Sequence, residues 1–193
     1  MRHLPLAMAL GILLWCQEAM GQGFNKRYDA FGQGYEQGAW GIDRSADGWL
    51  IFAFSYEPDT IVPPDSVNGS YMIILERIGP QGELIWEKKH RVHRNSIFLG
   101  WADCCDSVVG GGYATAGSFA GLDNPDSIAK VHLMRYDANG DTLWTRDFGD
   151  STHYWIGQQV KQTADGGFLI VGYTNATGYE DGLAIKTDSL GNE

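Results

Sequence analysis

The sequence predicts an all-β protein, a β-propeller-like array of four-stranded antiparallel blades, with about three blades represented. One block of residues recurs at intervals of roughly 50 to 60 residues, which is typical of repeat architectures. The 193 residues include 26 Gly and only 6 Pro, and 44% of them are hydrophobic. Such a composition indicates a folded chain with many tight turns between short strands.

The first part of the repeat predicts two opening strands and the turn between them. Each copy has an apolar or thiol residue, a polar stretch, one or more Gly, an aromatic residue, and then apolar and small residues. The copies cover residues 42–55, 105–118 and 160–174, and their aromatic residues are Trp49, Tyr113 and Phe168. Gly at residues 48, 110–112 and 166–167 supplies the turns, because Gly accepts the positive φ that tight hairpins need.

The second part of the repeat predicts the third and fourth strands of each unit. It covers residues 71–86 and 131–144, and a third copy starts at residue 183 and stops before its last strand. Gly82, Gly140 and Gly191 occupy the same turn in the three copies. Longer connections, residues 57–69 and 120–127, join the middle strands.

The opening strands also indicate how the units pack. Residues 49–54 and 168–173 are almost continuously apolar, whereas a strand with one wet face alternates apolar and polar residues. Both faces of these strands are therefore expected to be covered, as in radially stacked blades. A β-sandwich and a β-solenoid are the alternatives, but a sandwich needs no repeat of this length and solenoid coils are usually shorter.

The N-terminus predicts export. Arg2 and His3 precede an apolar stretch over residues 4–15, and Ala19 and Gly21 stand at −3 and −1 of a cleavage site. We therefore expect a signal peptide over residues 1–21 and a secreted or cell-surface protein. Residues 22–193 then hold the propeller repeats, in units of about 28–90, 91–150 and 151–193, with the last one incomplete. The apolar stretch is too short to cross a bilayer of ~30 Å as a helix, so no membrane span is expected.

Charge and cysteine content narrow the possible partners. The formal net charge is −10, and no basic stripe is present, which excludes nucleic acid as a ligand. Cys104 and Cys105 are the cysteines left after signal cleavage. Cys105 aligns with the apolar Ile42 and Val160, so a buried, inert thiol is the first interpretation. A disulfide between the adjacent cysteines and a redox or metal role are the alternatives.

Two stretches of the third copy resemble a known repeat. They read QTADGGFLIVGYT (residues 162–174) and DGLAIKTDSLGN (residues 181–192), and WTRDFG (residues 144–149) fits between units. This pattern is similar to the T-x-DGG-F/Y repeat of secreted Bacteroidetes proteins, over roughly residues 28–193. The first copy departs most, because it lacks the second Gly after Asp47 and has Gly79 where the last turn usually has Asp.

The resemblance implies a β-propeller exported to the cell surface or medium. Proteins of this kind often carry a C-terminal sorting domain for type IX secretion, and most have no assigned activity. With only about three units and a break inside the third, the resemblance implies that the chain is a truncated fragment of a larger propeller.

No catalytic, cofactor-binding or metal-ligating residue is predicted, and no cofactor is expected. Gly-x-Ser-x-Gly is absent, and residues 110–112 lie inside a hairpin, so they are no phosphate loop. His90 and His93 would point to opposite faces of a strand, which argues against a metal pair. His132 and His153 are expected in packing or turn roles. Residues 137–141 resemble the start of a calcium loop, but a hairpin turn is the better interpretation.

The tryptophans offer the main alternative to a purely structural interpretation. Three of them precede the second strand of a unit and two end the last strand, and this recurrence predicts packing between blades. These residues are Trp40, Trp101, Trp155, Trp86 and Trp144. A carbohydrate platform is the alternative, and it would require residues outside the repeat pattern.

The function expected from the sequence is that of an exported, non-enzymatic β-propeller repeat protein, a cell-surface or secreted binding or adhesion module. Its ligand would be an extracellular glycan or protein, held by variable loops on a rigid scaffold. The alternatives are a glycan-active hydrolase or lyase on a propeller scaffold and a structural spacer in a multidomain surface protein.

Overall fold

The protein is an all-β molecule. A computed structural model describes residues 23–28, 36–45, 48–58, 69–91, 95–101, 103–121 and 128–193, and every regular element within them is a strand. The all-β prediction is therefore confirmed for these residues, while the predicted signal peptide over residues 1–21 and His93 lie outside them. The strands are β1 (Glu36–Ser45), β2 (Gly48–Pro58), β3 (Gly69–Ile78), β4 (Leu84–His90), β5 (Asn95–Leu99), β6 (Cys105–Ser107), β7 (Tyr113–Gly121), β8 (Lys130–Tyr136), β9 (Thr142–Phe148), β10 (Trp155–Gln162), β11 (Phe168–Thr174) and β12 (Asp181–Thr187).

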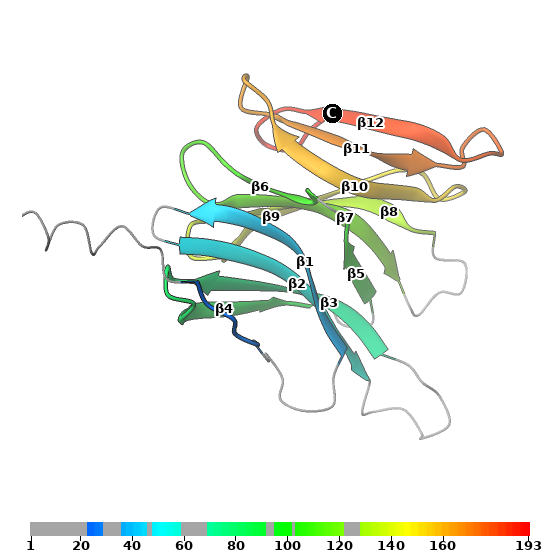
Figure 1. Cartoon of the computed structure of the whole chain (residues 1–193). Coiled ribbons are helices and arrows are strands. Elements are labelled where there is room, and N and C mark those ends of the chain that lie inside the picture. Colours follow the sequence, from blue (N-terminus) through cyan, green and yellow to red (C-terminus); the bar gives the residue numbers. More distant parts are fainter. Residues whose placement is uncertain are drawn as a thin grey trace, which may run out of the picture.

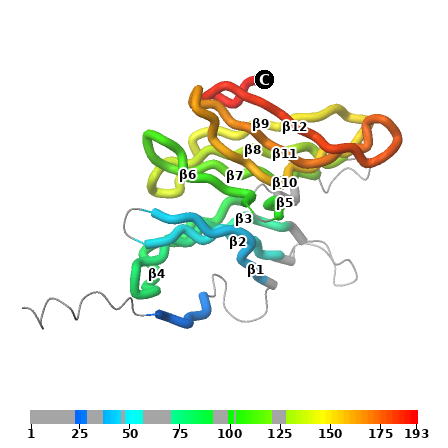
Figure 2. The backbone as a smooth tube through the Cα atoms, turned by 45° about the horizontal axis from the view of Figure 1, so that its top comes forward, coloured from blue at the N-terminus to red at the C-terminus, as the bar shows by residue number. Residues whose placement is uncertain are grey.

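These strands form three antiparallel sheets, each from one continuous stretch of sequence. The first sheet has the order β1-β2-β3-β4, and the third has the order β10-β11-β12. The second sheet runs β5-β7-β8-β9, and β6 pairs with β7 beside β5. Apart from β5 and β6, which both pair with β7, consecutive strands within a sheet pair with each other, and no strand of one sheet is inserted into another. Figures 1 and 2 show the three sheets lying one on another in chain order.

The sheets stack face to face through two separate cores. The core between the first and second sheets contains Leu50, Phe52, Ile73, Leu75, Leu99, Cys104, Cys105, Tyr113, Met134 and Tyr136. The core between the second and third sheets contains Val108, Ala114, Ala116, Val131, Leu133, Phe148, Val160, Phe168, Ile170 and Ile185. Along β7 and β8, successive side chains enter the two cores in turn, because side chains alternate across a strand. The second sheet is therefore the one that is covered on both faces.

The same register position faces the same way in every sheet. Tyr113 and Phe168, which the repeat aligns, both point toward the preceding sheet. Leu50 and Ala114, also aligned, both point toward the following sheet. Leu169 of the third sheet aligns with Leu50 and Ala114, so it points away from the second sheet. On that outer face Leu169 is 39% exposed. The expected burial of both faces is therefore wrong for residues 168–173. In residues 49–54, Leu50 and Phe52 are fully buried, whereas Trp49 and Ile51 on the other face of the strand are only partly buried.

The glycine at the start of each second strand is fixed by a backbone contact. A Cβ on Gly48, Gly112 or Gly167 would lie 2.0–2.1 Å from the carbonyl oxygen that ends the third strand of its sheet. No side chain fits at that distance. The single Gly of the first copy is therefore equivalent to the second Gly of the DGG pattern, and the first Gly is the one it lacks.

A basic side chain on the third strand repeats in all three sheets and binds this turn. The Arg77 guanidinium donates to the carbonyl of Trp49 at 3.2 Å, and that of Arg135 donates to the carbonyl of Tyr113 at 3.2 Å. Lys186 occupies the same position, and its Nζ donates to Asp165 at 2.8 Å. These hydrogen bonds hold the hairpin against the sheet.

The last hairpin of each unit is the same turn. Gly82, Gly140 and Gly191 have φ values of 77°, 79° and 79°. The Asp188 carboxylate accepts the backbone N–H groups of Leu190 and Asn192 at 2.8 Å each. In the first sheet Glu83 takes this role: its carboxylate accepts the N–H of Gln81 at 3.1 Å and fills the space beside Gly79. The missing Asp of the first copy is thus replaced from the other end of the turn.

Among the described residues, no helix has the length and apolar character needed to cross a membrane.

Candidate functional site

The candidate site starts from an irregularity that recurs in the first strand of each sheet. The pairing of β1 with β2 shifts by one residue at Trp40, and the pairing of β10 with β11 shifts at Gln158. In the second sheet the same place is occupied by residues 100–104, which separate Leu99 in β5 from Cys105 in β6. Bulges of this kind redirect side chains and are common next to functional sites. The second sheet thus carries an insertion that the other two lack.

The insertion presents Trp101 to solvent. Trp101 is 65% exposed, and its ring lies 5.0 Å from that of Trp40 at an interplanar angle of 36°. Trp40 is 37% exposed and meets Phe54 edge-on at 5.0 Å, and Phe54 lies 5.9 Å from Tyr71. The result is a continuous row of aromatic rings from the first sheet to the second. We call the surface formed by Trp40, Trp101, Ile42 and Asp103 the tryptophan surface.

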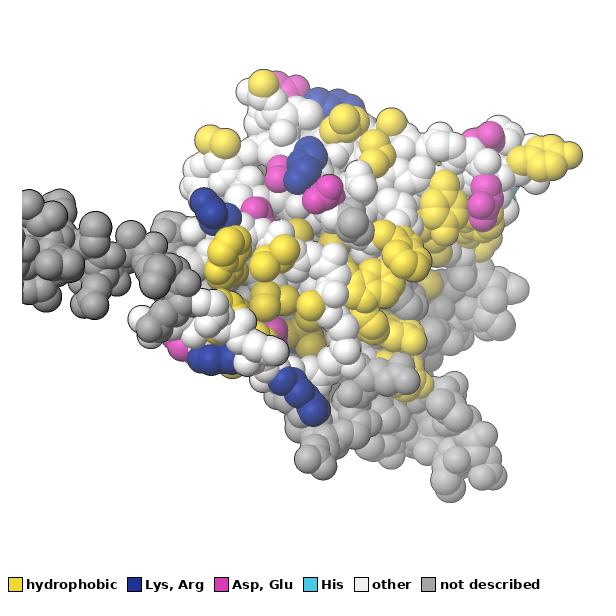
Figure 3. Space-filling model, viewed as in Figure 1, with side chains coloured by type: hydrophobic (Ala, Val, Ile, Leu, Met, Phe, Trp, Pro, Cys, Tyr) yellow, Lys and Arg dark blue, Asp and Glu magenta, His cyan; other side chains and the backbone are white. Residues whose placement is uncertain are grey.

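Two cavities lie beside Trp40. The larger, about 410 Å³, is lined by Ala39, Trp40, Gly41, Ile42, Ile51, Asp103 and Cys105. The smaller, about 170 Å³, is lined by Trp40, Phe54, Tyr71 and Leu99. The larger volume falls in the range of small-molecule sites. Figure 3 shows apolar side chains gathered across the middle of this face.

The inserted segment is held in place by the third sheet. The backbone N–H of Trp101 donates to Oε1 of Gln158 at 3.3 Å, and the carbonyl of Asp103 accepts the N–H of Val160 at 3.2 Å. A Cβ on Gly100 would lie 2.0 Å from the carbonyl oxygen of Gln158, so Gly is required there. The bulge of one sheet therefore anchors the insertion of its neighbour.

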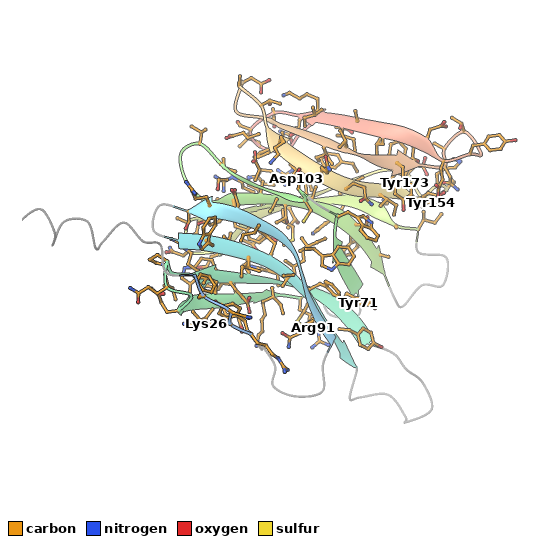
Figure 4. The ribbon with its side chains drawn as sticks, viewed as in Figure 1. Lys26, Tyr71, Arg91, Asp103, Tyr154 and Tyr173 are labelled. Atoms are coloured by element: carbon orange, nitrogen blue, oxygen red, sulfur yellow. The ribbon has the colours of Figure 1, made fainter. Side chains whose placement is uncertain are left out.

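Asp103 has the backbone geometry of a specialised position. Its φ is 61°, and it is the one non-glycine residue with positive φ in the part of the chain that the structure describes. Asp tolerates this conformation better than most residues, but it still costs energy, and such positions gather at functional sites. Figure 4 shows Asp103 just below β10, where the third sheet meets the sheets beneath it.

The two cysteines mark the end of the insertion, with Cys104 its last residue and Cys105 the first residue of β6. Cys104 and Cys105 are buried, free thiols, and a Cβ on Gly41 would come within 2.9 Å of the Cys105 sulfur. The hydrogen bond with Cys104, together with burial, raises the pKa of Cys105. A thiol that stays protonated is a poor nucleophile and a poor metal ligand, so Cys105 acts here as a small apolar residue.

The tryptophans divide into two groups. Trp86, Trp144 and Trp155 pack against the cores, as the repeat predicts. Trp40 and Trp101 lie outside these cores and pack on each other between the first and second sheets, while Trp101 stays 65% exposed. The predicted alignment of the tryptophans is wrong, because the strand register aligns Trp40 with Gln158 rather than with Trp155, and Trp101 lies in the insertion. A comparison of spacing within the repeat could have located this insertion.

The remaining candidates have structural roles. The His90 ring packs 4.8 Å from Tyr136, and its Nδ1 lies 3.1 Å from the Thr142 hydroxyl. His132 is buried, and its Nδ1 is hydrogen-bonded to the Asp147 carboxylate. His153 is hydrogen-bonded through Nδ1 to the Asp150 carboxylate within a turn. The Asp137 carboxylate accepts the N–H groups of Asn139 and Asp141 at 2.8 and 2.9 Å, which confirms the hairpin turn over residues 137–141. In the described ranges no three metal-ligating side chains cluster.

One pair of carboxylates lies elsewhere. Glu76 in β3 is directly opposite Glu87 in β4, and burial followed by the charge of Glu87 raises the pKa of Glu76. Most glycosidases use a pair of carboxyl groups for catalysis. However, Glu76 is only 5% exposed, and Glu87 is bound by Lys89 at 3.0 Å. A substrate has no access to a carboxyl group that is buried to this degree.

No protein-family model matches the chain, and no curated protein matches it.

Proposed function

We propose that the protein is an exported, non-enzymatic binding module whose three sheets are consecutive blades of a β-propeller. The shared stacking direction of the sheets supports this arrangement, because each sheet offers the next the same face. The opening strands also meet one another: the Asp106 carboxylate accepts the N–H of Gln162 at 2.7 Å, and the Ser107 hydroxyl donates to the carbonyl of Arg44 at 3.3 Å. Strands that converge in this way are what blades around an axis require.

The exposed face of the third sheet supports the same arrangement. Leu169 and Val171 stand at the positions of Leu50 and Phe52, which form the stacking face of the first sheet. They are 39% and 37% exposed. A further sheet of the same repeat would find apolar partners there. Export through residues 1–21 and a place at the cell surface belong to the same proposal, and the charge pattern and apolar stretch of those residues support them.

The observation that carries the binding function is the exposed Trp101, on an insertion that breaks the repeat. Packing against the cores accounts for Trp86, Trp144 and Trp155. It does not explain why Trp101 is 65% exposed to solvent. Exposed apolar patches rimmed by polar groups mark interaction sites. The tryptophan surface combines such a patch with a cavity and a carboxylate, and it therefore supports binding better than catalysis.

The test is a binding comparison between the chain and a variant with Trp40→Ala and Trp101→Ala. Both proteins are applied to arrays that carry glycans and deglycosylated extracellular proteins such as collagens. We expect the chain to bind members of one class and the variant to lose that binding, while far-UV circular dichroism stays the same. Binding to neither class, or equal binding by both proteins, would contradict the proposed function.

A further inference from the structure

We infer that the ligand of the tryptophan surface is an uncharged glycan, with one sugar ring stacked on Trp101 and its hydroxyl groups donating hydrogen bonds to Asp103. This inference rests on the proposed binding function and names the ligand class for it. It is carried by three properties of the site: the shape of its apolar part, the chemistry of its polar part, and its charge.

The apolar part is built on two tryptophan rings that lie 5.0 Å apart at an interplanar angle of 36°. One face of the Trp101 ring packs on Trp40, and the exposed fraction of 65% requires that much of the rest is open to solvent. Ile42, which is 64% exposed, continues the apolar surface along the larger cavity. A sugar ring has one face of C–H groups that fits a flat aromatic ring, and it carries its polar groups around the edge.

The polar part of the site accepts hydrogen bonds. An ionised carboxylate such as that of Asp103 has acceptors only, so its partner must bring donors. Sugar hydroxyls are donors, and they surround the edge of the ring. Asp103 lies two residues after Trp101 and lines the same cavity as Trp40, on whose ring Trp101 packs. The aromatic rings and the acceptor therefore belong to one connected surface.

The charge of the site favours an uncharged ligand over an acidic one. None of the residues that line the two cavities beside Trp40 is Lys or Arg. Asp103 places a negative charge at the larger cavity, and the whole chain carries a formal charge of −10. The charge of Lys161 interacts with that of Asp103, so the surroundings carry both signs, and the negative net charge of the chain disfavours uronates, sulfated glycans and phosphate groups. An uncharged sugar meets no such penalty.

The segment is also fixed before any ligand binds. Gly100 packs against the backbone of Gln158, and hydrogen bonds to Gln158 and Val160 hold both Trp101 and Asp103. A rigid site loses less conformational entropy on binding, which favours measurable affinity from a small contact area. The backbone at Trp101 and at Asp103 is thus held by the third sheet in the absence of a ligand.

The experiment is isothermal titration calorimetry with the whole chain and soluble oligosaccharides. The uncharged probes are hexamers of glucose, xylose, mannose and N-acetylglucosamine, and an oligogalacturonate is the charged probe. We expect at least one uncharged probe to bind, Trp101→Ala to weaken it about tenfold or more, and Asp103→Asn to weaken it less. The matched control is Tyr179→Ala, because Tyr179 is an aromatic side chain that is 82% exposed and lies outside the site.

The outcomes separate the two proposals. Binding of the oligogalacturonate alone, or of no probe, would overturn the glycan inference, as would equal affinities for the chain and Trp101→Ala. If the chain nevertheless binds an extracellular protein through Trp40 and Trp101, the binding function stands and only the ligand class is wrong. Trp101 is mostly in water, so its replacement is expected to leave the thermal midpoint unchanged, and a melt of each variant checks this.

Discussion

Ile170 and Val171 give a direct test of how the sheets stack. They are neighbours at the centre of β11, and both are β-branched, so replacing either by Ala loses a similar strand preference. They differ in surroundings: Ile170 is fully buried between the second and third sheets, whereas Val171 is 37% exposed on the opposite face. The pair therefore isolates the contribution of the stacking core from that of the strand itself.

The expected magnitudes follow from these exposures. Ile170→Ala removes three buried carbon atoms and leaves a cavity, and it should cost about 2–5 kcal/mol. Val171→Ala removes two methyl groups at ~0.8 kcal/mol each when fully buried, and with a third of the residue exposed it should cost about 1 kcal/mol. The difference of about 2 kcal/mol corresponds to more than a tenfold change in the ratio of folded to unfolded protein.

The assay is equilibrium unfolding in urea, followed by far-UV circular dichroism and by tryptophan fluorescence. The free energies of unfolding are compared at a common dependence on urea concentration. Equal losses for the two variants, or a larger loss for Val171→Ala, would refute the assignment of the core to the Ile170 face. Coincident transitions from the two probes would also show that the sheets unfold together.

Three further predictions concern turns and titrating groups. Gly112→Ala places a Cβ against a backbone carbonyl at a φ of 79°, and it should lower the free energy of unfolding by at least about 2 kcal/mol. Gly182 has open space around it, so Gly182→Ala should be neutral or slightly stabilising in the same thermal melts. Burial lowers the pKa of His90, so the contribution of the neutral ring to stability is present above about pH 6.5 and is lost as the pH falls below that value. The variant His90→Gln should remove this pH dependence from unfolding curves taken between pH 5 and 8. Hydrogen bonds from backbone N–H groups lower the pKa of Asp137 and of Asp188, so these turns stabilise the fold above about pH 4 and lose that contribution as the pH falls through the lowered pKa. The double variant with Asp137→Asn and Asp188→Asn should show a free energy of unfolding that depends less on pH in acid.

The repeat could be predicted from the sequence because its determinants are local. The Gly of each last turn and the aromatic residue that opens each second strand are visible without any knowledge of pairing. Gly79 was the visible departure from the pattern, but its compensation was not, because Glu83 replaces the Asp carboxylate only through a contact across the turn. A pattern of letters does not show which of two nearby acids bonds to a backbone N–H group.

The candidate site could not be predicted in the same way. Aligning Trp101 with Trp155 assumes equal strand lengths, and that assumption fails where the second sheet has residues 100–104 in place of a bulge. The strain at Asp103 is a property of φ, which no composition reports. What the sequence did provide was the criterion that a binding residue should lie outside the repeat. Trp101 meets that criterion once the register is known.

The physical reason for this location is that stacking leaves little freedom elsewhere. In the second sheet, side chains on both faces of β7 and β8 are buried against neighbours, and a change there would disturb one core or the other. In the insertion of the second sheet, Trp101 and Asp103 are exposed, whereas Cys104 at its end is buried in the core between the first and second sheets. Trp40, Trp101 and Gln158 occupy this position in successive sheets, and contacts join Trp40 to Trp101 and Trp101 to Gln158. The same position in each sheet therefore forms one row, and an extended ligand lying along it would meet a side chain from every sheet in turn.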